Sequence, residues 1–507
     1  MHPALLVDEI LRQIIEFCYS SAERKADATR TLARLARTCR AWRDPALDRL
    51  WWRLDCVAPL LALTRLARDQ LFEEHLLQYG RRVKHLTLAR LGSQLTSDLG
   101  NFLFTTAETS LGQNLLPNLG NLTIHKDAWS YTSKLMPFII SRALHTIDLH
   151  TSSQASLSVF HDFVETIRRV SSPIDTAVLR GPFNSEIQSL LTSLSSIRIY
   201  HSKRNQSLRA SEIFALSRLP LLAELHIDGC SLNVDEVMAC IEAQPIHAPS
   251  FPALESLHLS APSALIEHIL EASSSSTLRT VYLDIQDRAL TTAPWRTIFS
   301  ILGKKAAGTL QNLTATHFVD ADESDLAAGP VPVEMTFTVN DLRDLRTVKS
   351  LRSFTLQSSF PTDLCDDDMD AIAQWWPNIE HLAVETGHIA MEGHSASHRE
   401  CKHPSLTLGC LTSWARSCPQ LDYLVLPRMD VGVGCPNPTQ PFAPHNALRS
   451  LSIAIDEAMN ETEQAAEYLH ALFPCLAALG AVDDDAKWEG MRRALQRRSP
   501  ATTFVPL

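Results

Sequence analysis

The residues best suited to chemistry lie in one polar segment of the sequence. It contains His388, His394, His398, Cys401 and His403, and imidazole and thiolate groups are the usual ligands of zinc. Their spacing matches no common zinc module, because a structural site normally pairs two well-spaced ligand knuckles. Histidines also occur in polar loops because they are soluble there. We therefore predict no metal site and no cofactor, with a zinc-binding loop over His388–His403 as the alternative.

Two runs of three aspartates, at 366–368 and 483–485, are the other candidates for a cation site. Both stand where a helix is expected to begin, and a helix N-terminus favours negative charge. The sequence contains no G-x-G-x-x-G, phosphate-loop, G-x-S-x-G or H-E-x-x-H motif. A Ser-His-Asp site assembles only in space, so an enzyme remains a distant alternative. We expect no catalytic residues.

The elements that would position these residues follow a repeat. An apolar-x-x-apolar-x-apolar motif recurs about every 30 residues, the scale of a leucine-rich repeat that contains a helix. The motif begins at Val83, Leu119, Leu144, Ile174, Leu194, Leu222, Leu254, Leu278, Leu310, Leu351, Ile379, Leu421, Leu448 and Leu476.

The positions of six prolines support the same repeat. A proline stands two residues before the first apolar position at Pro117, Pro220, Pro252, Pro377, Pro419 and Pro474. Proline cannot continue a helix and biases the preceding residue toward an extended shape. Each repeat is therefore expected to run from helix, through a proline stop, to a short strand.

We accordingly predict an α/β solenoid with parallel strands on a concave face and helices outside. Side chains alternate along a strand, so the fourth and sixth motif positions should be buried and the odd positions exposed. The exposed positions carry mixed polar and aromatic side chains, which suit a protein surface. The candidate target-binding residues are Asp148, Arg198, Tyr200, His226, Asp228, His258, Tyr282 and Asp284. The alternative is a solvated face without a ligand.

The first 55 residues do not follow the repeat. Apolar residues recur at helical spacing around Ile10 and Ile14, and again around Leu32 and Leu35. The segment between them, residues 20–28, is too polar to be core. Several tryptophans and leucines follow, and a unit of roughly 50 residues cannot bury that much apolar surface alone. Part of it should face the rest of the chain or another protein.

The order E-I-L-x-x-I-I, then L-A-x-x-A-R-T-C-R-x-W, then A-L-x-x-L-W resembles an F-box, in the variant of fungal-type F-box-like proteins. That family docks onto the Skp-type adaptor of a cullin-based ubiquitin ligase. The family usually begins Leu-Pro, whereas this chain has Leu6-Val7. The resemblance implies adaptor contacts for Leu6, Ile10, Leu11, Ile14, Leu35, Cys39, Trp42, Leu47 and Trp51.

Composition limits the partners and the compartment. A net charge of −11 argues against a general nucleic-acid binder, which needs a basic face. No apolar run is long enough to cross a membrane, and the N-terminus does not resemble a secretory signal. The 11 cysteines are odd in number and irregularly spaced, which fits reduced thiols in the cytoplasm or nucleus.

The expected organisation has four parts: an F-box-like module over residues 1–55, a connecting helix over 56–82, irregular leucine-rich repeats over 83–482, and a C-terminal capping helix and tail over 483–507. The implied function is the substrate receptor of a ubiquitin ligase, which holds an adaptor and an unknown protein target together. The alternative is a repeat scaffold without a ligase role, whose N-terminal helices only cap the repeats.

Overall fold

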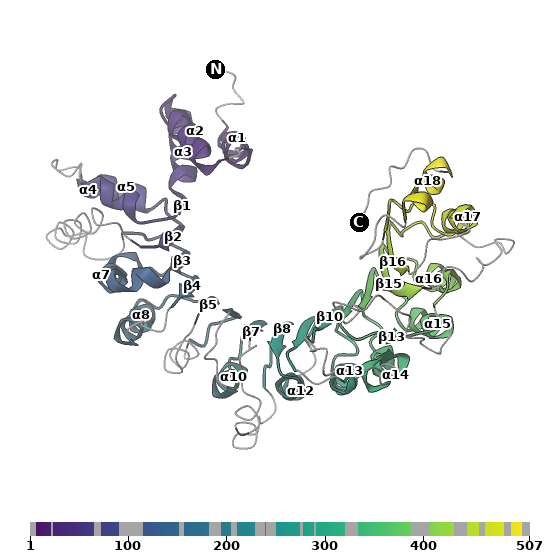
Figure 1. The fold of residues 1–507 in the computed structure, drawn as a ribbon. Helices are drawn as coiled ribbons and strands as arrows, with labels where there is room; N and C mark the ends of the chain where they lie inside the picture. Colours follow the sequence, from purple (N-terminus) through teal and green to yellow (C-terminus); the bar gives the residue numbers. More distant parts are fainter. Residues whose placement is uncertain are drawn as a thin grey trace, which may run out of the picture. The chain divides into compact units, whose positions relative to one another are not determined.

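The computed structural model (Figure 1) describes residues 7–21, 24–64, 72–90, 115–151, 157–181, 194–203, 210–228, 239, 250–273, 277–287, 291–319, 333–386, 406–429, 444–455, 462–480 and 488–498. The chain divides into two compact units, Met1–Leu222 and Ala223–Leu507. In both units parallel strands alternate with helices, so the predicted α/β fold of leucine-rich-repeat type is confirmed.

The first unit contains one parallel sheet in which each described strand pairs with the next along the chain. Its strands are β1 (Arg53–Leu54), β2 (His85–Leu88), β3 (Asn121–Ile124), β4 (Thr146–His150), β5 (Thr176–Arg180) and β6 (Ile199–Lys203). Its helices are α1 (Asp8–Ser20), α2 (Lys25–Leu35), α3 (Arg40–Trp51), α4 (Ala58–Thr64), α5 (Phe72–Gly80), the 3-10 helix η2 (Lys126–Ala128), α7 (Trp129–Ile139), α8 (Leu157–Val170) and α10 (Ala210–Ser217).

The second unit repeats the arrangement. Its main parallel sheet has the order β7 (Glu224–Asp228), β8 (Ser256–Ala261), β9 (Thr280–Ile285), β10 (Asn312–His317), β12 (Ser353–Ser358), β14 (His381–Thr386), β15 (Tyr423–Met429), β16 (Ser450–Ile455) and β17 (Ala478–Gly480). A separate pair joins β11 (Phe337–Thr338) to β13 (Thr362–Asp363).

The helices of the second unit include α12 (Ser263–Ala272), α13 (Ala293–Lys305), α15 (Asp366–Trp375) and α16 (Leu411–Ser417), which line one side of its strands (Figure 1). The others are η3 (Val333–Met335), α14 (Val339–Leu342), η4 (Arg343–Thr347), η5 (Leu408–Cys410), α17 (Thr462–Leu472) and α18 (Glu489–Arg498). We call the opposite side of the strands the helix-free face.

Burial alternates along the strands as the motif predicts. Leu257 and Leu259 of β8 are fully buried, and they occupy the fourth and sixth positions of their repeat. Ile266 and Ile269 of α12 are fully buried as well. Strand leucines and helix side chains thus form one apolar layer, whereas the odd strand positions remain at least partly exposed along most strands.

One repeat differs from the prediction. Elsewhere the strand begins at the third motif position, but β6 is shifted three residues, because Thr176 pairs with Ile199 instead of Ser196. Ile197 and Tyr200 thereby become the buried first and fourth positions, and Ser202 takes the buried sixth position. The predicted exposure of Tyr200 is wrong, because its side chain lies in the core. Arg198 is exposed but precedes the strand.

The N-terminal region is more continuous with the sheet than expected. In the described parts of residues 56–82, where a connecting helix was expected, the structure has α4 and α5; residues 65–71 lie outside the described ranges. The short strand β1 follows α3 directly and pairs with β2. Residues 20–28 were expected to be too polar for the core, yet α2 begins at Lys25 and buries Ala28. No helix in the described ranges is long and apolar enough to cross a membrane.

Close packing of α13 on η4 depends on a glycine. A Cβ atom added at Gly303 would lie 2.3 Å from the backbone oxygen of Asp344, whereas one at Gly308 would meet nothing within 4 Å. Thr347 also donates a hydrogen bond to the carbonyl oxygen of Gly303, at 2.7 Å.

We predict that Gly303→Ala lowers the free energy of unfolding by about 1–3 kcal/mol, because α13 must move away from η4. Gly308→Ala is the matched control and should change stability by no more than about 0.5 kcal/mol. Thermal unfolding of both variants checks this. Equal stability of the two variants would contradict the packing described here.

Candidate binding surfaces

Helix α1 has two apolar stripes, and only one of them is buried by the protein. Leu11 and Ile15 are each 2% exposed, and Ile15 packs in a cluster with Leu32 of α2 and Ala46 of α3. The second stripe contains Val7, Ile10 and Phe17, which are 42%, 36% and 70% exposed, with half-buried Ile14 between them. Spacings of three, four and three residues place these four side chains on one side of the helix. We call them the outward stripe.

Ion pairs hold α1 in this orientation against α3. Arg12 lies 2.7 Å from Asp8 and 3.3 Å from Asp48, and Arg49 lies 2.7 Å from Glu16. The hydrogen bond from Arg12 to Asp8 is the main cause of a raised Arg12 pKa. Since exposed ion pairs contribute little stability, the buried stripe provides most of the packing energy and the pairs fix the register of the helix.

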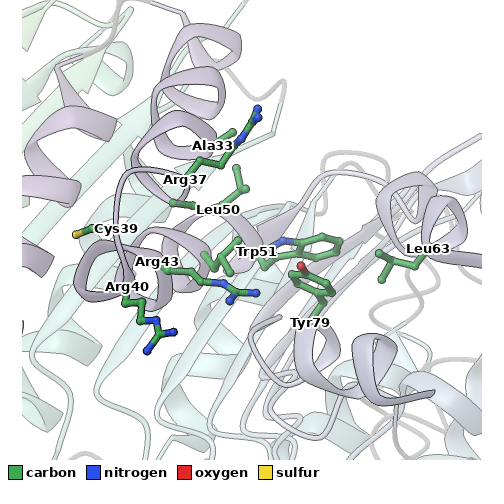
Figure 2. A pocket seen from close by; sticks show the side chains of 11 residues that line it. Ala33, Arg37, Cys39, Arg40, Arg43, Leu50, Trp51, Leu63 and Tyr79 are labelled. Carbon is green, nitrogen blue, oxygen red and sulfur yellow. The ribbon is translucent and has the colours of Figure 1, made fainter. Parts of the chain in front are cut away.

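A groove of about 800 Å³ lies beside α2 and α3 (Figure 2). Its apolar part includes Leu47, Leu50 and Trp51 of α3, and Trp51 stacks on Tyr79 of α5 at 4.7 Å between ring centroids. The remaining lining residues are Ala33, Ala36, Arg37, Cys39, Arg40, Arg43 and Leu63. The groove therefore combines an apolar wall with three guanidinium groups.

Arg82 joins this helical region to the sheet. Its guanidinium lies 2.6 Å from Asp44 and also contacts Asp48, while its side chain is only 13% exposed. One residue past α3, Trp52 packs edge-on against His85 of β2, at 4.3 Å between ring centroids. The β1–β2 pairing completes the junction. The N-terminal helices are thus built onto the end of the sheet.

The residues expected to contact an adaptor lie at three different places in the helical region. Ile10 and Ile14 belong to the outward stripe, whereas Leu11 faces the interior of the helical region, so the expected shared face does not include it. Leu6 lies outside the described residues. Cys39, Leu47 and Trp51 line the groove, and Leu35 and Trp42 are half-buried. Adaptor contact by these residues stays a prediction.

Three aromatic side chains stack along the helix-free face of the second unit. The strand register places His226 of β7, His258 of β8 and Tyr282 of β9 opposite one another. The ring centroids of His226 and His258 are 3.7 Å apart, and those of His258 and Tyr282 are 3.9 Å apart, with nearly parallel planes. Stacking covers both faces of the His258 ring. We call these three residues the ring ladder.

An acidic row lies two residues beyond the ring ladder. Asp228 and Asp284 lie on either side of Ser260, which donates a hydrogen bond to Asp284 at 2.7 Å. Gln286 donates a second bond to Asp284 at 2.5 Å. Burial raises the pKa of Asp284, and the negative charge of Asp228 raises it further, while the two hydrogen bonds oppose the change. No described lysine or arginine forms an ion pair with Asp228 or Asp284.

In the first unit, an aspartate at an outward strand position is paired with an arginine. Asp148 of β4 accepts hydrogen bonds from Arg180 of β5 at 2.9 and 3.2 Å. His150 lies 3.4 Å from the same carboxylate, and burial lowers the pKa of its imidazole. Of the expected target-binding residues, the structure therefore brings together His226, Asp228, His258, Tyr282 and Asp284. Asp148, in the first unit, is instead paired with Arg180.

Most of the candidate metal ligands lie where the structure does not describe the chain. The segment His388–His403 and the aspartates at 483–485 lie outside the described residues. Within them, no group of three His, Cys, Asp or Glu residues is placed to hold a metal ion. Asp366–Asp368 open α15 as expected: Asp368 accepts from the backbone nitrogen of Cys365, and Asp366 accepts from Thr407 at 2.6 and 2.8 Å.

Sequence reasoning missed Phe17, Val7 and the Arg82 junction. The first two were detectable, because positions 7, 10, 14 and 17 form a second helical stripe in the sequence. The sequence does not say which of two stripes is buried. The Arg82 junction joins residues 34 and 38 positions apart, and no local pattern encodes it.

Comparison with known proteins finds no matching protein-family model and no matching curated protein sequence. Solved structures do match. The yeast Rad7–Elc1 complex matches with 11% identity over 88% of this chain and 96% of that chain, at a TM-score of 0.34. The TLR13–ssRNA13 complex matches with 13% identity over 75% and 50%, at 0.37. An internalin from Listeria monocytogenes matches with 12% identity over 68% and 81%, at 0.32.

We predict that Arg82→Met loosens the junction and lowers the free energy of unfolding by about 1.5–3 kcal/mol, because two carboxylates lose a charge-assisted partner. The matched control is Arg30→Met, which removes an exposed pair with Asp27 and should cost at most about 0.5 kcal/mol. Thermal unfolding and limited proteolysis between α3 and β2 measure the effect. A junction as resistant as that of the control would count against the role of Arg82.

We predict that Asp284→Asn stabilises the protein at neutral pH. A folded-state pKa above the unfolded value means that the native state holds its proton longer, so stability falls as pH rises from the unfolded pKa through the folded one. The amide keeps the hydrogen-bonding oxygen but removes the charge. The gain in Tm over the wild type should shrink as the pH is lowered below the folded pKa.

Asp422→Asn serves as the control, because its carboxylate is exposed and lies 3.5 Å from Arg449. It should give no gain at any pH. A lower Tm for Asp284→Asn at neutral pH would show that burial of this carboxylate is not a cost.

Proposed function

We propose that this chain is a protein-interaction scaffold that acts as the substrate receptor of a Skp–cullin–F-box-type ubiquitin ligase. Its N-terminal helices bind a Skp-type adaptor, and the helix-free face of its repeats binds a protein target. The chain itself catalyses no reaction. It raises the effective concentration of the target near the transfer machinery, which is what a two-site scaffold contributes.

The observation that carries the proposal is the outward stripe of α1. Single exposed apolar residues are normal on a protein surface, but a row along one side of a helix marks an interaction site. Three of its four residues are more than a third exposed, and one is a phenylalanine exposed by 70%. An apolar helix side of this kind docks into a complementary groove or onto partner helices.

The groove also supports adaptor binding by the N-terminal helices. It brings Cys39, Leu47 and Trp51 together, and these residues match the later apolar positions of the F-box-like motif. Tryptophan and arginine are the residue types that dominate protein interfaces. We infer that an adaptor contacts both the outward stripe and the groove.

The alternative is a scaffold whose N-terminal helices only cap the repeats. Deleting residues 1–55 does not separate the two functions, because the deletion removes β1 and the Asp44 and Asp48 partners of Arg82. The sheet end would be damaged in either case. Substitutions on the outward stripe avoid this problem, since those side chains contribute little to the fold.

A ubiquitin-ligase role places the protein in the cytoplasm or nucleus. The described cysteines, Cys18, Cys39, Cys56, Cys365, Cys410, Cys418 and Cys475, are all free thiols, as a reducing compartment favours.

We predict that Ile10→Ala combined with Phe17→Ala weakens co-purification of the source organism's Skp-type adaptor by tenfold or more, because buried apolar anchors each contribute about 1–3 kcal/mol to an interface. Thermal unfolding should be almost unchanged. Gln13→Ala is the control, since Gln13 is an exposed polar residue of the same helix.

Two outcomes would contradict the proposal. If the wild type does not retain the adaptor at all, the scaffold without a ligase role is correct. If the wild type and the double variant retain it equally, the adaptor does not use the outward stripe.

A further inference from the structure

The outward positions of β7 to β14 carry several acidic side chains. From β7 to β14 these positions include Glu224, Asp228, Asp284 and Glu385, and none of them is a lysine or an arginine. Glu385 accepts a hydrogen bond from Gln357 at 2.8 Å, and Asp284 accepts from Ser260 and Gln286. The carboxylates of Asp284 and Glu385 thus accept hydrogen bonds from neutral donors.

A second, independent feature lies beside Asp284. Thr316 of β10 is paired in register with Asp284 on one side and Gln357 on the other. It is only 5% exposed, and its hydroxyl has no hydrogen-bond partner among the described residues. A buried hydroxyl without a partner costs free energy. A donor from a bound molecule would satisfy it.

The ring ladder provides the apolar part of the same surface. His226, His258 and Tyr282 form a rigid strip two residues before the acidic row on the same three strands. A long side chain with an aliphatic stem and a charged head suits this combination, because its stem covers rings while its head reaches the carboxylates.

We propose that this part of the helix-free face binds a basic segment of the protein target, with an arginine or lysine head group between Asp228 and Asp284. The inference rests on the proposed function only in assuming that the target binds the repeats. Arginine fits best, since its planar fork meets carboxylate oxygens in pairs and donates to a hydroxyl as well. Phosphorylated segments and nucleic acid are disfavoured here, because their charge has the same sign as that of the face.

The test uses the full chain and two fluorescein-labelled peptides, one of alternating arginine and serine and one with glutamate in place of arginine. Fluorescence anisotropy at low salt measures binding. We expect the arginine peptide to bind and the glutamate peptide not to bind. The triple variant Asp228→Asn, Asp284→Asn and Glu385→Gln should bind the arginine peptide about tenfold more weakly.

A matched triple variant separates this site from the general negative charge of the protein. Glu334→Gln, Asp344→Asn and Asp367→Asn remove the same charge from exposed positions in η3, η4 and α15. Its affinity for the arginine peptide should stay within about threefold of the wild type, because screened charges at a distance act weakly. Thr316→Val should weaken binding severalfold without lowering Tm.

Three results would overturn the inference: no binding of the arginine peptide, an equal loss in both triple variants, or binding of the glutamate peptide. Adaptor co-purification is measured on the same variants. It should be unchanged, because none of the substituted residues lies in the N-terminal helices. A failure of the basic-segment inference is therefore distinguishable from a failure of adaptor binding.

Discussion

The structure depends on keeping the fourth and sixth residues of each motif away from water. A strand such as β8 buries Leu257 and Leu259 completely, yet it has no second layer of its own to cover them. Neighbouring strands and the helix that follows provide that layer, so each repeat is stable only in a stack. At about 25 cal/mol per Å², the burial of each leucine contributes roughly 1.5–3 kcal/mol. Each connection returns the chain to the same end of the sheet, so neighbouring strands pair in parallel.

Both proposed binding surfaces consist of side chains that the packing of strands and helices does not cover. The helices cover one side of the strands, so the odd strand positions are free to carry polar groups such as Asp228 and Asp284. At the N-terminal end, α1 packs one apolar stripe against α2 and α3, and the small helical region has nothing with which to cover the other. Neither surface contributes much to folding. Selection for binding can therefore act on them with little cost in stability.

The sequence predicted the fold well where the signal was local and repeated. The strands that follow a motif begin at its third position, except at β6, where the strand is shifted by three residues and buries Tyr200 and Ser202. No local pattern in the sequence predicts this shift, because Ser202 is polar where the motif expects an apolar residue. The early strand β1 likewise depends on its pairing with β2.

The sites were predicted less completely, for a related reason. The ring ladder residues were identified because alternation along a strand assigns them to one face, but their stacking requires the register of three strands. Leu11 was placed with Ile10 and Ile14 because α1 is apolar on two sides. Helical periodicity alone cannot say which side the neighbouring helices cover.

Hydrogen–deuterium exchange of the full chain, with and without a Skp-type adaptor, tests most directly whether the two proposed surfaces are separate binding sites. We expect slower exchange in α1 and α3 when the adaptor is bound, and unchanged exchange in β7–β14. Slower exchange in β7–β14, or no change in α1, would contradict this expectation.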